Sequence, residues 1–328
     1  MVNILIIGAT GYVGHALSQS LVRSGNHRVY GLARSPEKAA SLARNEVLPI
    51  LSSITSAALA EAINEHRIDI VVDVSGANQD SYTLLTLVQK NGAERLAAAK
   101  KEGIRIQKLG FIYCSGTWVH GSSNSPINDL VPVGTASAPF PATELTAWRP
   151  ELERAVLASS DVLDVVVVRP ALVYGRSSAI WTSLFEPLYA AAQNSKVNGG
   201  KEVEGVVKVQ VEEESRPGLV HVDDVASGFH CAIEKLSLIA GTGVYPVFDL
   251  QTSQESMRDI LTSAAKEFEW KGKVELVGAG EDLFMRAMSV SGNGCSGRAK
   301  TVLGWEPRRY GFVSGMDVFA KAWVASRS

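Results

Sequence analysis

The chain has 328 residues and 46% of them are hydrophobic, so it can bury the core of one large α/β domain or of two lobes. Its formal net charge of -2 gives no electrostatic reason to expect nucleic acid or an anionic membrane as a partner, and its three widely spaced cysteines predict neither a disulfide framework nor a metal site. No apolar run is long enough to span a bilayer, and the first predicted strand leaves no room for a signal peptide, so we expect a soluble cytoplasmic protein.

A glycine-rich turn follows the first predicted strand. Residues 2–7 are a short apolar run, residues 8–14 form the turn, and residues 15–22 have the pattern of a helix. In a Rossmann fold, glycines at this place let the backbone approach a pyrophosphate, and the helix N-terminus directs free N–H groups at it. The spacing is G-x-x-G-x-x-G, and three glycines can also serve only a tight turn. The position between a buried-type strand and a helix favours dinucleotide binding.

Strand and helix patterns continue to alternate after this turn. Predicted strands cover residues 27–33, 47–51, 69–75, 110–115 and 164–169, and predicted helices cover residues 35–44, 57–66, 84–101 and 150–159. Regular alternation predicts a mostly parallel sheet with helices on both faces. The β-branched run at 164–169 is expected to be buried on both of its faces.

The alternation ends near residue 175. Residues 177–217 have the pattern of helix and loop, residues 244–250 that of a late strand, and residues 257–328 that of a smaller helical region. We predict an α/β fold, a Rossmann-type doubly wound parallel sheet with a smaller, discontinuous C-terminal substrate lobe. The dinucleotide-binding domain would comprise residues 1–175 plus about 219–250, and the substrate-binding lobe about 176–218 and 251–328. Substrates commonly bind in the cleft between two such lobes.

Five landmarks occur in order along the chain. They are the turn at residues 8–14, the strand end at 111–121, the run at 169–175, the segment at 219–226 and a leucine–glycine–tryptophan turn at 303–307. With these landmarks the chain resembles an extended, atypical short-chain dehydrogenase/reductase of the NAD(P)-dependent epimerase/dehydratase family. The resemblance spans nearly the whole chain. It implies a small-molecule substrate and helices through which a homodimer can form.

The resemblance also implies a cofactor site, position by position. The pyrophosphate loop is matched by Gly8, Thr10, Gly11, Tyr12, Val13 and Gly14, and the adenine position by Ser53 and Ile54. The nicotinamide ribose position is matched by Ser75, Gly76 and Ala77, and the nicotinamide amide loop by Pro170, Ala171, Leu172 and Val173. An acidic residue is common in the family at the adenine position, and Ser53 departs from that pattern.

The end of the second predicted strand bears on the choice of cofactor. A carboxylate there would accept hydrogen bonds from the ribose hydroxyls and favour NAD(H). Residues 31–35 contain no carboxylate, and Arg34 is placed to meet a 2′-phosphate. Arg34 could also be a surface arginine without a ligand, but we favour NADP(H) over NAD(H).

The catalytic pair of the family is missing. The family uses a tyrosine as proton donor or acceptor and a lysine four residues later, and none of the eight tyrosines of this chain has that lysine. The alignment places Leu145 at the tyrosine position and Arg149 at the lysine position. Arg149 can hold a ribose or a substrate oxygen, but a guanidinium stays protonated and cannot act as an acid.

The chain also departs from the family at the position of the catalytic hydroxyl. Its position falls on Gly116, with Ser115 and Thr117 on either side, and Thr117 is the better candidate to face the cleft. His120 stands where the family usually has another tyrosine. A lone histidine is more often a packed or surface residue than a catalyst, so both roles stay open for His120.

These departures leave three functional hypotheses. The first is an NADP(H)-linked oxidoreductase that acts on a small, apolar carbonyl or hydroxy compound. The second is an isomerase, epimerase or dehydratase without net redox, and the third is a non-catalytic protein that senses the NADP(H) pool. A set of apolar residues favours an apolar substrate over a sugar nucleotide, unless these residues are ordinary core: Trp181, Leu184, Phe185, Leu188 and Tyr189.

Overall fold

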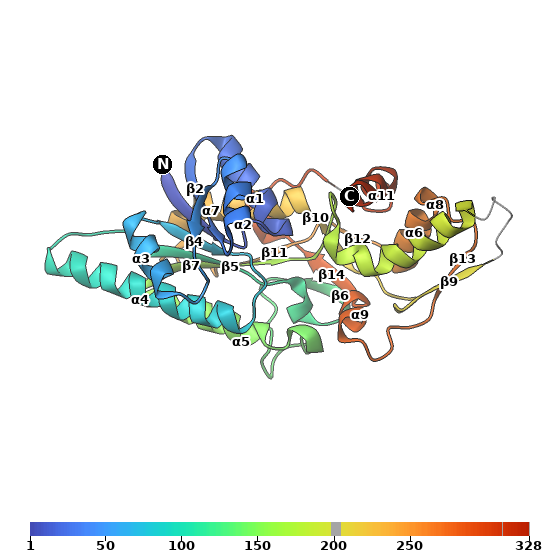
Figure 1. The fold of residues 1–328 in the computed structure, drawn as a ribbon. Helices are drawn as coiled ribbons and strands as arrows, with labels where there is room; N and C mark the ends of the chain where they lie inside the picture. Colours follow the sequence, from blue (N-terminus) through green and yellow to red (C-terminus); the bar gives the residue numbers. More distant parts are fainter. Residues whose placement is uncertain (198–204, 310, 328) are drawn as a thin grey trace.

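A seven-stranded parallel sheet organises the computed structural model, which describes residues 1–197, 205–309 and 311–327 (Figure 1). The strand order is β3 (Leu48–Leu51), β2 (His27–Ala33), β1 (Val2–Ile7), β4 (Ile70–Asp73), β5 (Leu109–Cys114), β7 (Leu163–Pro170) and β11 (Val247–Leu250). The chain order reverses between β1 and β4, and doubly wound sheets bind ligands beside the carboxyl ends of strands at such a point. The predicted fold class is confirmed.

Helices cover both faces of this sheet. On one face lie α1 (Tyr12–Ser24), α2 (Pro36–Arg44) and α7 (Val222–Ile239), and on the other lie α3 (Ala57–Glu65), α4 (Gln79–Lys101) and α5 (Arg149–Ala158) (Figure 1). Each face of the sheet has its own hydrophobic core. Ile4 and Ile6 of β1 belong to the core beneath α1, α2 and α7, and Leu5 and Ile7 belong to the core beneath α3, α4 and α5. Successive side chains of a strand point to opposite faces, so a continuous apolar run is what a doubly covered strand requires.

Several element boundaries differ from the predicted ones. α4 begins at Gln79 and not at residue 84. The prediction missed its first turn because that turn is polar and shows no apolar periodicity. This turn is held by Ser81, whose hydroxyl donates to the buried Asp73 carboxylate at 2.7 Å. The late strand β11 begins at Val247 and not at residue 244.

Part of the predicted helix and loop region is strand. Residues 206–209 form β9 (Val206–Val209), which pairs in parallel with β13 (Lys273–Leu276). β14 (Gly292–Cys295) pairs in the same way with β6 (Ser123–Asn128). The predicted lobe segments 176–218 and 251–328 also include residues 198–204, 310 and 328, which lie outside the described residues.

A third core lies at the other end of the molecule, among α6 (Thr182–Val197), α8 (Met257–Glu267) and α11 (Met316–Ala325) (Figure 1). Trp181 and Phe185 are completely buried in it, and the Phe185 ring contacts the Trp323 ring at a centroid distance of 5.6 Å. Leu184 and Leu188 are buried as well, and Tyr189 packs partly buried against them. These residues are therefore core, and they no longer argue for an apolar substrate. No helix in the described part of the chain has the length and apolar character of a membrane span.

Candidate functional site

The carboxyl ends of β5 and β7 enclose a pocket of about 170 Å³, here called the catalytic pocket. Its lining contains seven of the residues predicted for catalysis or for the nicotinamide: Ser115, Thr117, Arg149, Pro170, Ala171, Leu172 and Val173. Val13, which was predicted for the pyrophosphate loop, lines it as well. Sequence reasoning missed Cys114, Trp118 and Ile180 in the same lining. Cys114 and Trp118 adjoin the predicted Ser115 and Thr117 in sequence and could have been found from that position, whereas only the fold brings Ile180 to this strand end. The pocket lies where a doubly wound sheet places its ligands.

Arg149 is the one charged side chain among the described residues of the catalytic pocket. Its guanidinium covers Gly116, because a Cβ atom added to this glycine would lie 3.0 Å from Nη1 of Arg149. Nε of Arg149 and Oγ of Ser115 are buried and have no hydrogen-bond partner among the residues that the structure describes. A buried donor without a partner costs free energy, so these atoms point to a ligand that brings an acceptor oxygen.

A buried ion pair holds the helix that carries Arg149. Nε and Nη2 of Arg169 donate to the two carboxylate oxygens of Glu153 at 3.0 and 2.5 Å, and Nη1 lies 3.7 Å from Oδ1 of Asp249. Burial disfavours the charged guanidinium, but the neighbouring carboxylates of Glu153 and Asp249 raise the pKa of Arg169 above its usual range. Arg169 therefore stays charged, and its contact with Glu153 fastens α5 to β7.

His120 does not line the catalytic pocket. Its Nε2 lies 2.8 Å from Oδ2 of the buried Asp249, and its Nδ1 is buried with no partner in the described part of the chain. His120 instead faces a small neighbouring cavity, which shares Thr117, Trp118 and Leu172 with the catalytic pocket. Thr117 thus lies between the two spaces.

Cys114 adds a thiol to the catalytic pocket. Burial raises the pKa of this thiol to about 12. The thiolate is the nucleophilic form of cysteine, so Cys114 is not poised for nucleophilic attack at neutral pH.

A second hollow of about 270 Å³, here called the cofactor hollow, lies beside the turn between β1 and α1. Seven residues predicted for the cofactor line it: Gly8, Thr10, Gly11, Arg34, Ile54, Ser75 and Ala77. Lys38 and Asp80 were not predicted. Lys38 lies in the first turn of α2, and Asp80 lies in the first turn of α4.

The glycine turn fits a pyrophosphate. Gly8 has a φ of +88°, and a Cβ atom on Gly14 would lie 2.1 Å from the carbonyl oxygen of Gly8, so both positions exclude a side chain. Gly11 is the N-cap of α1 and no side chain caps the helix. The first N–H groups of a helix have no acceptor within it, and they suit an anion. The residues present therefore fit a nicotinamide dinucleotide.

Two cations stand at the end of the cofactor hollow that follows β2. The side chains of Arg34 and Lys38 are exposed and make no hydrogen bond or ion pair with any described residue. Asp80, from the first turn of α4, is the one carboxylate among the described lining residues.

Five predicted residues line neither the catalytic pocket nor the cofactor hollow: Tyr12, Gly14, Ser53, Gly76 and His120. Tyr12 instead donates its hydroxyl to the carbonyl oxygen of Gly175 at 2.5 Å, and burial raises its pKa well above the usual range. Gly14 serves the close packing of the turn, and Gly76 has a φ of +68°. Ser53 is exposed, and its carbonyl oxygen accepts a hydrogen bond from the N–H of Ser56.

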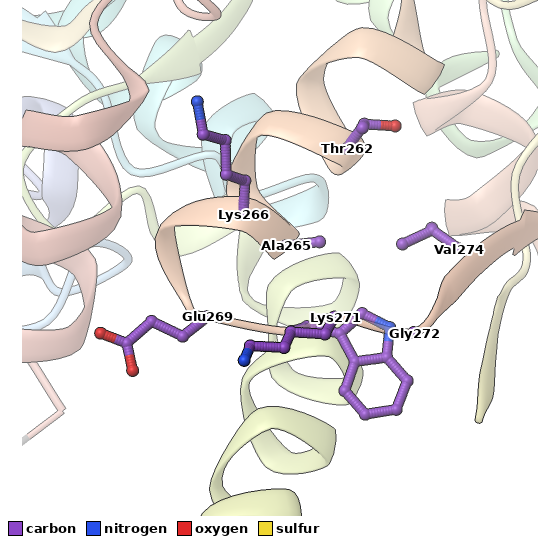
Figure 2. Close-up of a pocket in the computed structure, with 8 residues that line it drawn as sticks. Thr262, Ala265, Lys266, Glu269, Lys271, Gly272 and Val274 are labelled. Carbon is purple, nitrogen blue, oxygen red and sulfur yellow. The ribbon is translucent and has the colours of Figure 1, made fainter. Parts of the chain in front are cut away.

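A third hollow, of about 560 Å³, lies at the end of α8 and the start of β13 (Figure 2). Its charged side chains Lys266, Glu269 and Lys271 extend in different directions and converge on no common point (Figure 2). None of the predicted site residues is among its described lining residues. We therefore place the candidate site in the catalytic pocket and the cofactor hollow.

Comparison with known proteins identifies the family and the fold. A family model described as NAD dependent epimerase/dehydratase family matches residues 4–247. No curated protein is similar enough in sequence to match. Among solved structures, dTDP-glucose 4,6-dehydratase from Bacillus anthracis str. Ames in complex with NAD has a TM-score of 0.67 and 16% identity, over 100% of this chain and 98% of that one.

Two epimerases are similar in the same way. UDP-glucuronic acid 4-epimerase from Bacillus cereus, in complex with UDP-glucuronic acid and NAD, has a TM-score of 0.65 and 16% identity over all of both chains. UDP-glucose 4-epimerase from Bifidobacterium longum, in complex with NAD+ and UDP, has a TM-score of 0.65 and 15% identity, over 99% of this chain and 98% of that one. At these identities the structures establish a common fold, while the family model covers most of the sequence. The chain belongs to the NAD dependent epimerase/dehydratase family.

Proposed function

We propose that the chain is an NADP(H)-binding enzyme that moves a hydride to or from a substrate carbon that bears an oxygen. The reaction would take place in the catalytic pocket. The observation that carries the proposal is the Arg149 guanidinium over Gly116, whose buried Nε and the neighbouring Ser115 hydroxyl have no hydrogen-bond partner among the described residues. A preorganised cation and hydroxyl donors stabilise negative charge that develops on a substrate oxygen.

Arg34 and Lys38 support NADP(H) as the cofactor. Both side chains are exposed and have no partner among the residues that the structure describes. Arg34 follows β2 and Lys38 lies in α2, so the two cations suit the 2′-phosphate that distinguishes NADP(H) from NAD(H). Asp80 is the one carboxylate among the described lining residues, and it belongs to α4 and not to the end of β2. The solved relatives described above hold NAD, so this preference would be a particular property of the chain.

When bound, the nicotinamide supplies or accepts the hydride. In the reducing direction a C–H bond forms at the substrate carbon, the electron pair of the C=O π bond moves to oxygen, and that oxygen takes a proton. Arg149 would hold the oxygen without giving up a proton, because a guanidinium is protonated at any physiological pH. Thr117 lines both the catalytic pocket and the cavity of His120, so its hydroxyl is our candidate to pass a proton from His120 or a water molecule to that oxygen.

The family assignment favours one substrate class over the other. Its relatives of known structure include enzymes bound to UDP-glucuronic acid or crystallised with UDP, and the residues that argued for an apolar compound are core. We therefore place a sugar nucleotide ahead of an apolar carbonyl compound. A second candidate follows from the same family, an epimerase or dehydratase in which the hydride returns to the sugar and no net redox occurs.

A substrate panel with two simultaneous readouts tests this proposal. Sugar nucleotides and small carbonyl compounds are incubated with the protein and NADP(H), while NADPH absorbance and product mass or stereochemistry are followed. Consumption of NADPH supports net reduction, and a new product at constant absorbance supports the redox-neutral enzyme. Cofactor binding with no product across the panel contradicts an enzymatic role and favours a sensor.

A matched pair of arginine variants ties any turnover to the catalytic pocket. Arg149→Gln should lower turnover by about 10²–10³, the usual effect of removing a donor to a developing oxyanion. Arg154→Gln changes an exposed arginine on the same helix and should leave turnover as it is. Equal turnover of the two variants would show that Arg149 has no role in the reaction.

A further inference from the structure

We propose that His27, His230 and Glu234 form a binding site for a divalent transition metal of the zinc type. The three residues offer one ligand atom each, and these atoms all lie within 4.8 Å of one another. His27 is the first residue of β2, and His230 and Glu234 stand one turn apart on α7. Nothing in the predicted hydride-transfer function requires this cluster.

The distances suit a tetrahedral ion. Oε1 of Glu234 lies 3.5 Å from Nε2 of His230 and 3.8 Å from Nε2 of His27. Bonds of about 2.0–2.1 Å in a tetrahedral zinc site separate neighbouring ligand atoms by roughly 3.4 Å. Small rotamer changes would close the difference, and the Glu234 side chain is 45% exposed and therefore free to move. Two imidazoles and a carboxylate are a donor set that zinc accepts, with water at the fourth position.

His27 is the second, independent observation that points to a ligand. Its side chain is only 6% exposed, and both of its ring nitrogens are buried without a hydrogen-bond partner among the described residues. Buried polar atoms are nearly always paired, so an imidazole with two unpaired nitrogens requires an explanation. The ring meets His230 edge to face at a centroid distance of 5.5 Å, and an ion shared by the two rings would supply a partner for Nε2 of His27.

Ser20 of α1 orients the second histidine. Its Oγ lies 2.9 Å from Nδ1 of His230. With Nδ1 donating to this hydroxyl, the lone pair of His230 is on Nε2, the atom that faces Glu234. Metal-binding histidines commonly have such a partner on the other ring nitrogen, which fixes the tautomer and the ring orientation.

The site lies at the end of the sheet opposite to the cofactor hollow. His27 begins β2, whereas Arg34 follows the last residue of that strand, about 20 Å away at the usual rise per residue. A bound ion would join α7 to β2, and Ser20 would add α1. We infer a structural role, in which the metal stabilises the packing of this face of the sheet and takes no part in hydride transfer.

The experiment uses the untagged full-length protein after removal of metal with a chelator. Zn²⁺ affinity is measured by competition with a chromophoric chelator, and Co²⁺ is added separately as a spectroscopic probe. We expect one equivalent of Zn²⁺ to bind in the micromolar range or tighter and to raise the thermal midpoint. Co²⁺ should give the intense visible bands of a four-coordinate site.

Three variants and a control make the result specific. Glu234→Gln, at a partly exposed position, should still fold and should weaken Zn²⁺ binding by more than about 100-fold, and His230→Gln should do the same, since losing an outer partner already costs about 10–100-fold. Ser20→Ala should weaken Zn²⁺ binding by only about 10–100-fold, because Ser20 is such an outer partner. His15→Gln removes an exposed histidine of α1 and should leave the affinity unchanged.

Two outcomes would overturn the proposal. The first is a parent protein that binds no Zn²⁺ in this range. The second is binding that Glu234→Gln and His230→Gln leave at the parental affinity, which would place the ion elsewhere. Circular dichroism of the metal-free variants shows whether each is folded, and a folded Glu234→Gln protein alone decides the question.

Discussion

Glu153 of α5 and Arg169 of β7 form a two-point ion pair that is almost completely buried, with Nε to Oε1 at 3.0 Å and Nη2 to Oε2 at 2.5 Å. Arg149 precedes Glu153 by one helical turn, so both side chains lie on the same side of α5. The same helix thus has an anchor in the core and a cation in the catalytic pocket. We infer that this anchor helps to hold Arg149 over Gly116.

Removing the anchor should destabilise the protein. Glu153→Gln leaves the buried Arg169 guanidinium without its main counter-charge, and breaking a buried pair in this way costs about 3 kcal/mol or more. Urea unfolding measures the change in the free energy of unfolding. Glu151→Gln, an exposed change on the same helix, should cost less than about 0.5 kcal/mol. Equal stability of the two variants would contradict the role of the ion pair.

Ser115 and Thr117 offer a test of contact with the substrate. The hydroxyl of Ser115 has no hydrogen-bond partner among the described residues, so Ser115→Ala should leave the stability nearly unchanged. Thr117→Val keeps the side-chain shape and removes the donor, and we expect turnover to fall by about 10²–10³ with little change in cofactor affinity. Steady-state kinetics on any substrate found by the panel gives the result. A Thr117→Val protein with parental turnover would assign the proton transfer to another residue.

The fold could be predicted from the sequence, and so could several residues that line the hollow beside the glycine turn, because both depend on local patterns. The glycine spacing at 8–14 and the apolar runs follow from backbone geometry and from strand burial, which any chain of this fold must satisfy. The ion pair between Glu153 and Arg169 is a contact across the fold that no local pattern encodes. The apolar residues around Trp181 were misinterpreted for a related reason, since a helix facing a core and a helix facing a cleft have the same periodicity.

Substitutions of Gly11 and Gly14 should separate an effect on cofactor binding from an effect on folding. Gly14→Ala places a Cβ atom 2.1 Å from the Gly8 carbonyl oxygen, so it should destabilise the protein by about 1–3 kcal/mol. Gly11 is exposed, and the nearest atom to an added Cβ is 3.1 Å away. We expect Gly11→Val to stay folded and to lose cofactor affinity. Thermal unfolding and NADPH titration of both variants check the contrast, and an unchanged affinity in Gly11→Val would show that the turn is only structural.

We expect His221 to make the free energy of unfolding depend on pH. Its Nδ1 accepts a hydrogen bond from the N–H of Asp223 at the start of α7, and burial lowers the pKa of His221 to about 4 from 6.5. The unfolded chain therefore binds more protons between these values, and the stability due to neutral His221 is present above pH 6.5 and lost as the pH falls through 4.

The size of this term is about 3 kcal/mol at most. His221→Asn keeps a capping acceptor and removes the titration. The parent should therefore lose more stability than the variant as the pH is lowered from 7 to 4, by up to that amount. Urea unfolding at several pH values gives the difference, in which the other titrating groups cancel. Parallel curves for the two proteins would argue against a neutral, buried His221.

The most direct test of the account is titration of the protein with NADPH and with NADH, followed by fluorescence or calorimetry. A charge-assisted hydrogen bond contributes about 1.5–3 kcal/mol, so NADPH should bind about tenfold or more tightly than NADH. Arg34→Asp should reverse that order, whereas Arg44→Asp, the same charge change in the last turn of α2, should preserve it. Equal affinity of the parent for both cofactors, tighter binding of NADH, or binding of neither would contradict the NADP(H) site.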